Sequence, residues 1–502
     1  MTSDGRNRES ECFECFLILP WHFLYRPMAN IADLLDREVE LKMAKAELFL
    51  KLRELDDSLA RTRVHIAEMQ NINQEALTYN LPSEILSAIF EAGLSQGSES
   101  YTIYQDKKST KGKPFEIIVS SVSRRWRYIA LQTPRLWTDI HINISTSTGH
   151  LFHMYLCRSK VCLIDIMFKQ TTPRNGLDIS PRDNFSRHLD RLVPHVTRWR
   201  TFIVGYVDVG MPSVAFSPFA NLRAPALQTL VLDCINQHRQ TLELFSAGAP
   251  VLSSLELRGV CAQPPRDTVE SLKLGAAYNQ AFFSIDEFSQ LMSPMRSLVH
   301  LSMPLYALYG NHSNSTTLSP ITLPSLLSLD IRPTYGTVAI LRVIDIPSVE
   351  TVTFHSTTFD VIRELTLNHR TYSTLRSLTI VSDFDGKDTS AAQTLDFISL
   401  LPDVHDITFK GANPNPILRA IHDCRSIDQL FWPHLSAITL VPARRTTVAF
   451  KKQTWGYIMK TVENRFNLGN PISFVKLSSE LLERGTQGQQ RRLRERVTLV
   501  EC

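Results

Sequence analysis

The sequence predicts a mixed α/β protein with a long N-terminal helix, a small all-α segment and an irregular repeat solenoid that carries a parallel sheet. Three patterns indicate this fold class: leucines spaced by seven residues, short apolar helices that contain two tryptophans, and a recurring short strand pattern. These patterns divide the chain into segments 1–29, 30–79, 80–141, 142–482 and 483–502.

The composition excludes several classes of protein. The 502 residues carry 54 Lys and Arg against 50 Asp and Glu, and a net charge of +4 gives no electrostatic case for nucleic acid or an acidic membrane as a partner. Eight widely spread cysteines are too few for a disulfide scaffold and fit a reducing compartment, so we expect a cytoplasmic or nuclear protein. No run of about 18 uncharged apolar residues predicts a membrane span.

Residues 1–29 are predicted to be a disordered or poorly fixed tail. A signal peptide is the alternative, because two arginines precede the apolar run 12–25. Glutamates in and before the run, Pro20 within it and the lack of an A-x-A-like cleavage site argue against that alternative. Cys12 and Cys15 form a lone C-x-x-C, which lacks the further ligands that a zinc site needs, so we predict no metal.

Residues 30–77 are predicted to form one long amphipathic helix, because neither Pro nor Gly interrupts them. Two rows of residues recur every seven positions and form a coiled-coil-like seam. The first row is Ile31, Glu38, Lys45, Leu52, Leu59 and Ile66, and the second is Leu34, Leu41, Leu48, Leu55, Thr62 and Met69. Dimerisation through the seam and packing of the helix onto its own chain are the two alternatives, and the polar Glu38 and Lys45 weaken a stable dimer.

Residues 80–141 open with the sequence LPSEILSAIF. Pro82 suits the first turn of a helix, and Glu84 interacts favourably with the positive end of the helix dipole. A later helix is predicted to carry Val122, Trp126 and Ile129 on one face, and the segment closes with Leu136 and Trp137. Small helices this rich in apolar residues leave apolar surface that normally meets a partner.

This segment resembles an F-box, whose pattern opens with Leu-Pro-x-Glu, continues to a Val-Cys-x-x-Trp-like helix and ends near Leu-Trp. The layout, a heptad helix followed by this pattern, resembles F-box proteins abundant in mushroom-forming fungi. Ser123 stands where Cys is frequent, and residues 95–114 form a polar insertion that is predicted to be a solvated loop. The residues that the resemblance implies form or support an adaptor-binding surface are Leu81, Pro82, Glu84, Ile85, Ile89, Val122, Trp126, Ile129, Leu136 and Trp137.

The resemblance implies a non-catalytic receptor subunit of an SCF-type ubiquitin ligase. Its F-box docks a Skp-family adaptor and, through the adaptor, cullin, while another part of the chain holds a target protein that the sequence does not identify. The alternative is a repeat scaffold that binds a partner without any ligase role.

Residues 190–445 repeat the pattern apolar-x-x-apolar-x-apolar, which predicts one strand at each occurrence. The ten occurrences begin at Trp199, Leu227, Leu252, Val269, Leu298, Leu326, Val349, Leu375, Val404 and Leu435. Residues 142–482 therefore resemble the irregular leucine-rich-repeat domains that often follow F-boxes, and the resemblance implies a curved solenoid with a target on its concave face. An ordinary α/β domain is the alternative.

The flanks of this array carry weaker patterns. A helix that starts at Gly149 and one buried strand are predicted to form an atypical first turn, and residues 446–482 are predicted to form a C-terminal cap. The basic residues 483–502 are predicted to be a frayed tail or an exposed helix.

Motifs for catalysis are mostly missing, so we expect no enzyme, no catalytic residue and no cofactor. The sequence contains no G-x-G-x-x-G, no G-x-x-x-x-G-K-[ST] and no H-E-x-x-H. Residues 93–97 match the G-x-S-x-G nucleophile elbow, which makes a serine hydrolase built on Ser95 a third alternative. That elbow needs a strand before it, whereas a helix is predicted there.

Overall fold

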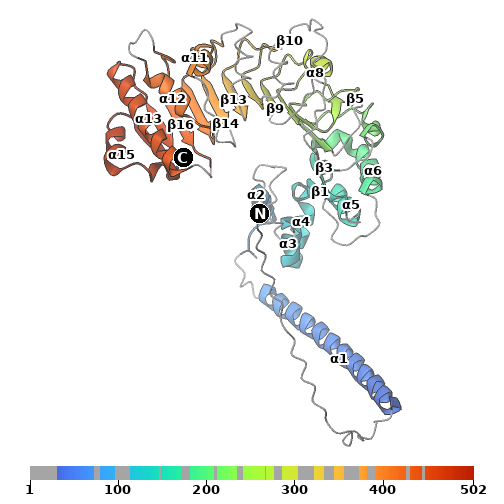
Figure 1. Ribbon diagram of the computed structural model, residues 1–502. Helices are drawn as coiled ribbons and strands as arrows, with labels where there is room; N and C mark the ends of the chain where they lie inside the picture. Colours follow the sequence, from blue (N-terminus) through green and yellow to red (C-terminus); the bar gives the residue numbers. More distant parts are fainter. Residues whose placement is uncertain are drawn as a thin grey trace, which may run out of the picture. The chain divides into compact units, whose positions relative to one another are not determined.

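Figure 1 shows the computed structural model, a mixed α/β protein as predicted. The chain divides into two compact units, residues 1–86 and 87–502, and each is described by itself. The structure describes residues 31–72, 78, 80–95, 114–145, 149–170, 181–207, 212–234, 241–265, 267–275, 285–303, 321–332, 344–355, 372–381, 391–424, 430–443 and 447–502. The predicted tail 1–29 and nearly all of the insertion 95–114 lie outside these residues.

The first unit contains helix α1, Ile31–Ile72, which confirms the predicted long N-terminal helix. Its side chains from residue 33 to residue 67 are all exposed. Ion pairs one turn apart, such as Lys42 with Glu38 at 2.7 Å and Lys51 with Glu47 at 2.6 Å, stabilise an isolated helix. The seam leucines are exposed as well, so burial does not account for the helix within this unit.

The second unit is dominated by one sheet, in which fourteen strands of the described residues follow each other in chain order. Every neighbouring pair in this sheet is parallel. The strands are β1 (Asp139–Asn143), β2 (Ile164–Lys169), β3 (Trp199–Val207), β4 (Thr229–Cys234), β6 (Ser254–Arg258), β8 (Ser271–Gly275), β9 (His300–Met303), β11 (Ser328–Ile331), β13 (Thr351–His355), β14 (Ser377–Val381), β15 (Asp406–Lys410), β16 (Ala437–Val441), β17 (Phe474–Leu477) and β18 (Thr498–Glu501). Two small parallel pairs, β5 (Thr241–Glu243) with β7 (Cys261–Gln263) and β10 (Ile321–Thr322) with β12 (Ile344–Asp345), stand beside it.

The ten predicted strands all form, from β3 to β16. In each occurrence of the pattern, the second and third apolar residues lie within the strand, and all three side chains are buried. Residues two apart on a strand point to the same face, so this spacing places a continuous apolar row on one face of the sheet. The identification of the units as leucine-rich repeats stays a prediction.

Helices and turns connect the strands, and Figure 1 shows α6, α8 and α11 along the outer side of the sheet. From β1 onward the helices are α5 (Gly149–Arg158), α6 (Pro181–Leu192), α7 (Pro212–Ala215), α8 (Ile285–Met292), α11 (Ala391–Ser399), α12 (Asn415–His422), α13 (Val448–Asn467), α14 (Ser479–Leu482) and α15 (Gln487–Arg494), with 3₁₀ turns η2 (Val193–Arg198) and η3 (Ser217–Phe219). The predicted helix at Gly149 and the predicted buried strand at residues 164–169 are both present as α5 and β2.

The C-terminal end forms an exposed helix, one of the two predicted alternatives, and not a frayed tail. Residues 487–494 form α15, with a capping box at Thr486 and Gln489, and residues 498–501 form β18, which pairs with β17. Leu493 and Val497 are buried, which anchors the basic helix. Strand β18 was not predicted, because two apolar residues among five arginines give a weak sequence signal, while the open edge of a sheet offers backbone partners to any extended segment.

A glycine pair tests the packing of this end. Gly485→Ala places a Cβ against the indole ring of Trp455, which is buried, so we expect this change to cost about 1–3 kcal/mol of stability. Gly456→Ala is the matched control, because it lies within α13 and its Cβ meets no atom within 4 Å, so alanine should stabilise by about 1 kcal/mol. Urea unfolding of the two variants checks the opposite signs; equal effects would contradict the packing.

Candidate functional site

The predicted F-box region forms a small helical module of α2 (Ser83–Ser95), α3 (Phe115–Val122), α4 (Arg124–Gln132) and the 3₁₀ turn η1 (Pro134–Trp137). In the second unit, its centre is made by Phe90 of α2, whose ring lies 5.0 Å from that of Trp126 of α4. Trp137 is fully buried and donates its indole N–H to the carbonyl of Ala130 at 2.9 Å. Ser87 and Thr133 share a hydrogen bond of 2.7 Å between their hydroxyls. These contacts give the module a packed centre.

The segment around Val122 and Trp126, which was predicted to be one helix, forms two helices, α3 and α4. Val122 was predicted to share a helical face with Trp126, but Val122 ends α3 and Trp126 belongs to α4. Ser123 separates them with an extended backbone, and its hydroxyl accepts the backbone N–H of Trp126 at 3.1 Å. Serine is a strong N-cap, so it starts a new helix where the apolar spacing alone suggested continuity. The prediction of a single face was wrong for Val122.

The predicted site residues fall into three groups by exposure. Pro82, Glu84, Ile85, Ile89 and Val122 are exposed, Leu81 and Trp126 are half-buried, and Ile129, Leu136 and Trp137 are buried. The buried group supports the module from within. The exposed isoleucines of α2, Ile85 and Ile89, are 48% and 49% exposed and lie one helical turn apart, so they share one face of the helix.

Helix α3 adds an exposed residue that the sequence analysis did not single out. Ile118 is 47% exposed and lies one turn before Val122, which is 57% exposed. Its spacing of four from Val122 was the signal that could have found it. Exposed apolar residues at i and i+4 on two short helices are a pattern typical of a helical docking surface.

Two contacts tie the module to the start of the sheet. The hydroxyl of Tyr155, on α5, donates a hydrogen bond to the buried carboxylate of Glu116 on α3. The guanidinium of Arg158 lies 4.3 Å from the ring centroid of Trp137, and the rings of Trp137 and Tyr155 meet edge to face at 5.3 Å. Burial, and then the Glu116 hydrogen bond, raises the pKa of Tyr155. Sequence reasoning missed Glu116 and Tyr155, since a partner 39 residues away has no local pattern.

The sheet presents a second surface, on the face opposite its leucine row. Strand neighbours in register line up one residue from each strand in a row that crosses the sheet: His141, Met167, Ile203, Val231, Glu256, Lys273, Ser302, Asp330, Thr353, Thr379, Thr408, Thr439, Lys476 and Val500. After the exposed His141, the row is apolar and buried at Met167, Ile203 and Val231, mostly charged in the middle, and formed by four threonines toward the other end. Its half-buried part therefore has two chemically distinct zones, one largely charged and one of threonines.

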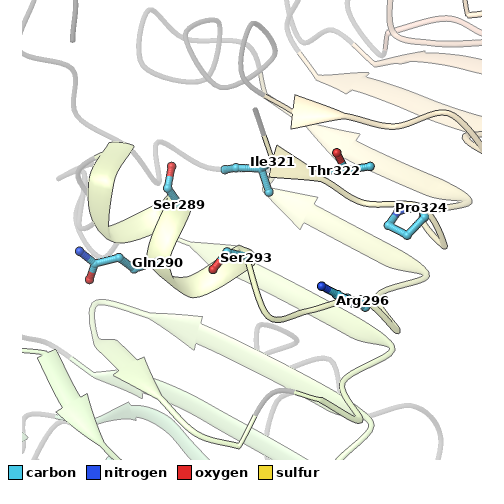
Figure 2. A pocket seen from close by; sticks show the side chains of 7 residues that line it. All are labelled: Ser289, Gln290, Ser293, Arg296, Ile321, Thr322 and Pro324. Carbon is cyan, nitrogen blue, oxygen red and sulfur yellow. The ribbon is translucent and has the colours of Figure 1, made fainter. Parts of the chain in front are cut away.

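A pocket of about 600 Å³ lies beside α8, and Figure 2 shows its lining. Ser289, Gln290 and Ser293 come from α8 or the turn after it, and Ile321, Thr322 and Pro324 face them across the opening, with Arg296 nearby. Among these described residues, hydroxyls, an amide and a guanidinium can bind a polar group. They include neither a carboxylate nor a histidine for proton transfer at neutral pH.

Other predicted motifs find no support as chemical sites. Ser95 is the last residue of helix α2, so the strand that a nucleophile elbow requires does not precede it. Within the ranges that the structure describes, no three His, Cys, Asp or Glu side chains gather into a group that could hold a metal ion. Cys12 and Cys15 lie outside the described residues.

Among the described residues, no helix combines the length and the apolar composition that a membrane crossing needs.

Comparisons with known proteins identify no family. No protein-family model matches the chain, and no curated protein matches it significantly.

Proposed function

We propose that the protein is the substrate-receptor subunit of an SCF-type ubiquitin ligase. The observation that carries the proposal is the helical module: it opens with Leu81-Pro82-Ser83-Glu84, it has a packed centre, and it still exposes Ile89, Ile118 and Val122. A folded module keeps such residues exposed at a cost in solubility, which an adaptor that covers them would remove. A Skp-family adaptor, and through it cullin, is the partner that the F-box resemblance implies.

The proposed receptor performs no chemistry itself. It raises the effective concentration of a target protein near the charged conjugating enzyme. The contacts of Glu116 with Tyr155 and of Trp137 with Arg158 hold the module against the start of the sheet, so a target on the threonine and charged zones would keep a defined position relative to the adaptor. In this proposal the target, rather than a cofactor, occupies the sheet.

Co-purification with the Skp adaptor of the same organism tests the proposal. We expect a stoichiometric complex from co-expression, with improved solubility of the chain. Leu81→Ala combined with Pro82→Ala should abolish adaptor pull-down and leave the circular dichroism spectrum intact, because both side chains lie at the start of α2 outside the core of the module. Retained adaptor binding in the double variant would contradict the proposed receptor function.

A scaffold without a ligase role is the second candidate, and the polar insertion between α2 and α3 is the observation that favours it. In the sequence this segment links α2, which exposes Ile85 and Ile89, to α3, and a segment that covered those side chains would exclude an adaptor. Deleting residues 96–113 separates the two candidates. If adaptor binding appears only after the deletion, the native chain is a scaffold; if binding is the same with and without the segment, the receptor proposal stands.

A further inference from the structure

Helix α1 exposes its two heptad rows along their whole described length. The apolar members from Leu34 to Met69 are between 48% and 70% exposed. Apolar rows that recur every seven residues over some 40 residues become buried when another helix with the same repeat lies alongside. Burial of the seam therefore needs a second helix alongside, and the residue pattern of the seam indicates which helix that is.

We propose that the seam of α1 pairs with the seam of a second copy of this chain, in an antiparallel two-helix coiled coil. In this pairing, residues whose numbers add up to 100 face each other. An antiparallel pair sets the first row of one helix against the second row of the other. The facing pairs are Ile31 with Met69, Leu34 with Ile66, Glu38 with Thr62, Leu41 with Leu59, Lys45 with Leu55, and Leu48 with Leu52.

This register matches every seam residue from 31 to 69 with a seam residue of the other copy. It also brings together two polar interruptions that belong to different rows, Glu38 and Thr62. An interface with a two-fold axis must be self-complementary, and a polar pair that forms twice across such an axis meets this requirement. The seam is complementary to the same seam running in the opposite direction, which is why we propose a second copy of this chain as its partner.

Charge separates the antiparallel pairing from the parallel one. In a parallel pair in register, Glu38 would face Glu38 and Lys45 would face Lys45, and like charges held together in a core repel each other strongly. In the antiparallel pair, Glu38 faces the hydroxyl of Thr62 and keeps its ion pair with Lys42 of its own helix, at 2.7 Å. Lys45 can cover Leu55 with its aliphatic stem while its ammonium group, 5.9 Å from the Phe49 ring centroid, stays at the edge.

The flanking positions favour the same orientation. Antiparallel pairing places Lys42 beside Asp56 of the second copy, and this attraction occurs twice because the pair is symmetric. It also places Phe49 of one chain beside Phe49 of the other. Parallel pairing would instead place Lys42 beside Arg37, which repels twice, although it would also bring Lys51 near Asp56. In the antiparallel pair Lys51 faces Lys51, and Glu47 on each helix holds that ammonium at 2.6 Å. Core and flank together select the antiparallel pair.

Light scattering on the full chain tests the association. At micromolar concentration we expect a mass twice the 57.1 kDa of one chain. Leu48→Glu with Leu52→Glu puts four carboxylates at the centre of the interface and should raise the dissociation constant by about 100-fold or more, leaving monomers. Leu50→Glu is the matched control: Leu50 is 63% exposed, against 66% and 59% for Leu48 and Leu52, but it points away from the seam, so the dimer should persist.

Disulfide cross-linking tests the orientation, in a full chain whose Cys12, Cys15, Cys157 and Cys502 are replaced by serine. One preparation carries Lys45→Cys and another carries Leu55→Cys. In the antiparallel pair, positions 45 and 55 face each other, while two copies of the same position lie about 15 Å apart along the helix, too far for a disulfide. We therefore expect covalent dimers only when the two preparations are mixed.

Each other result overturns the proposal. Cross-links within a single preparation would mean a parallel pair, and an absence of cross-links in the mixture would mean a different register. A monomeric wild-type chain, a trimer, or a dimer that survives Leu48→Glu with Leu52→Glu would exclude the seam as a two-copy interface. Adaptor binding is a separate measurement, so failure of the receptor proposal leaves these outcomes unchanged.

Discussion

A chain that carries Ile89→Glu and Val122→Glu is expected to lose about 100-fold in affinity for the Skp adaptor, or about 2.7 kcal/mol, and to remain folded. The two side chains are 49% and 57% exposed on α2 and α3, so glutamate at either position meets water in the free chain. In a complex it would be buried against the adaptor without a partner, and an unpaired buried charge is costly. Calorimetry with purified adaptor measures the affinity, and thermal unfolding checks the fold.

The control for this variant introduces the same number of glutamates in place of exposed apolar residues, but at positions outside the helical module. Val161 and Val214 are apolar and 88% and 67% exposed, but neither belongs to the helical module. Val161→Glu with Val214→Glu should bind adaptor as the unaltered chain does. Equal loss of binding in both double variants would point to a general effect of added charge, and full binding by the α2–α3 variant would remove this surface from the proposal.

Arg465→Ala is expected to destabilise the C-terminal end of the sheet by about 2–5 kcal/mol. Arg465, on α13, is fully buried, and burial lowers the pKa of its guanidinium to about 10, which still leaves it charged at neutral pH. Its two terminal nitrogens donate to the carbonyls of Phe431 and Trp432 at 3.1 Å and of Pro433 at 3.3 Å. Alanine would remove all three bonds and open a cavity beside them; the Trp432 and Pro433 carbonyls keep donors in the Leu435 backbone N–H at 2.9 Å and the Asn470 amide at 2.7 Å, whereas the Phe431 carbonyl loses its Arg465 donor.

The backbone at the same place explains why the loss should be large. Trp432 has a φ of 52°, the left-handed region that costs about 1–2 kcal/mol for a residue other than glycine. The Arg465 hydrogen bonds hold this turn two to four residues before Leu435, the first apolar residue of the β16 pattern. Hydrogen exchange should therefore show faster opening of β16 and β17 in the variant than of β2 and β3.

A second arginine serves as the reference for this experiment. Arg491 of α15 has 85% of its side chain exposed and forms a surface ion pair with Glu495 at 3.4 Å. Arg491→Ala should change stability by less than about 0.5 kcal/mol, as expected for a surface pair. A change at Arg465 as small as that at Arg491 would show that the carbonyl contacts do not hold this end together.

The sheet was the part of the fold most readable from the sequence. Each strand needs only a local signal, apolar residues spaced by two on one face, and that signal recurs ten times from Trp199 to Leu440. Strand β18 lacked it: its residues are Thr498, Leu499, Val500 and Glu501, and three of the four are exposed. A strand at the end of a sheet is held by backbone hydrogen bonds to its neighbour, and those carry no side-chain pattern.

The candidate site was readable only in part. Apolar spacing identified the residues of the helical module, but not which of them would be buried inside it. Trp137 and Ile129 were predicted beside Ile85 and Ile89, yet the first two are buried and the last two are exposed. The residue types alone did not predict the contact between Glu116 and Tyr155. They did not predict the helix cap at Ser123 either.

The sequence by itself determined the α/β class, the long N-terminal helix, the position of each strand from β3 to β16 and the residues of the helical module, because period and capping chemistry are local. Only the tertiary structure decided which apolar side chains remain exposed, where Arg465 finds its acceptors and how the last twenty residues join the sheet. Those outcomes depend on which surfaces meet after the chain has folded, and a hydrophobic residue favours burial without specifying its neighbour.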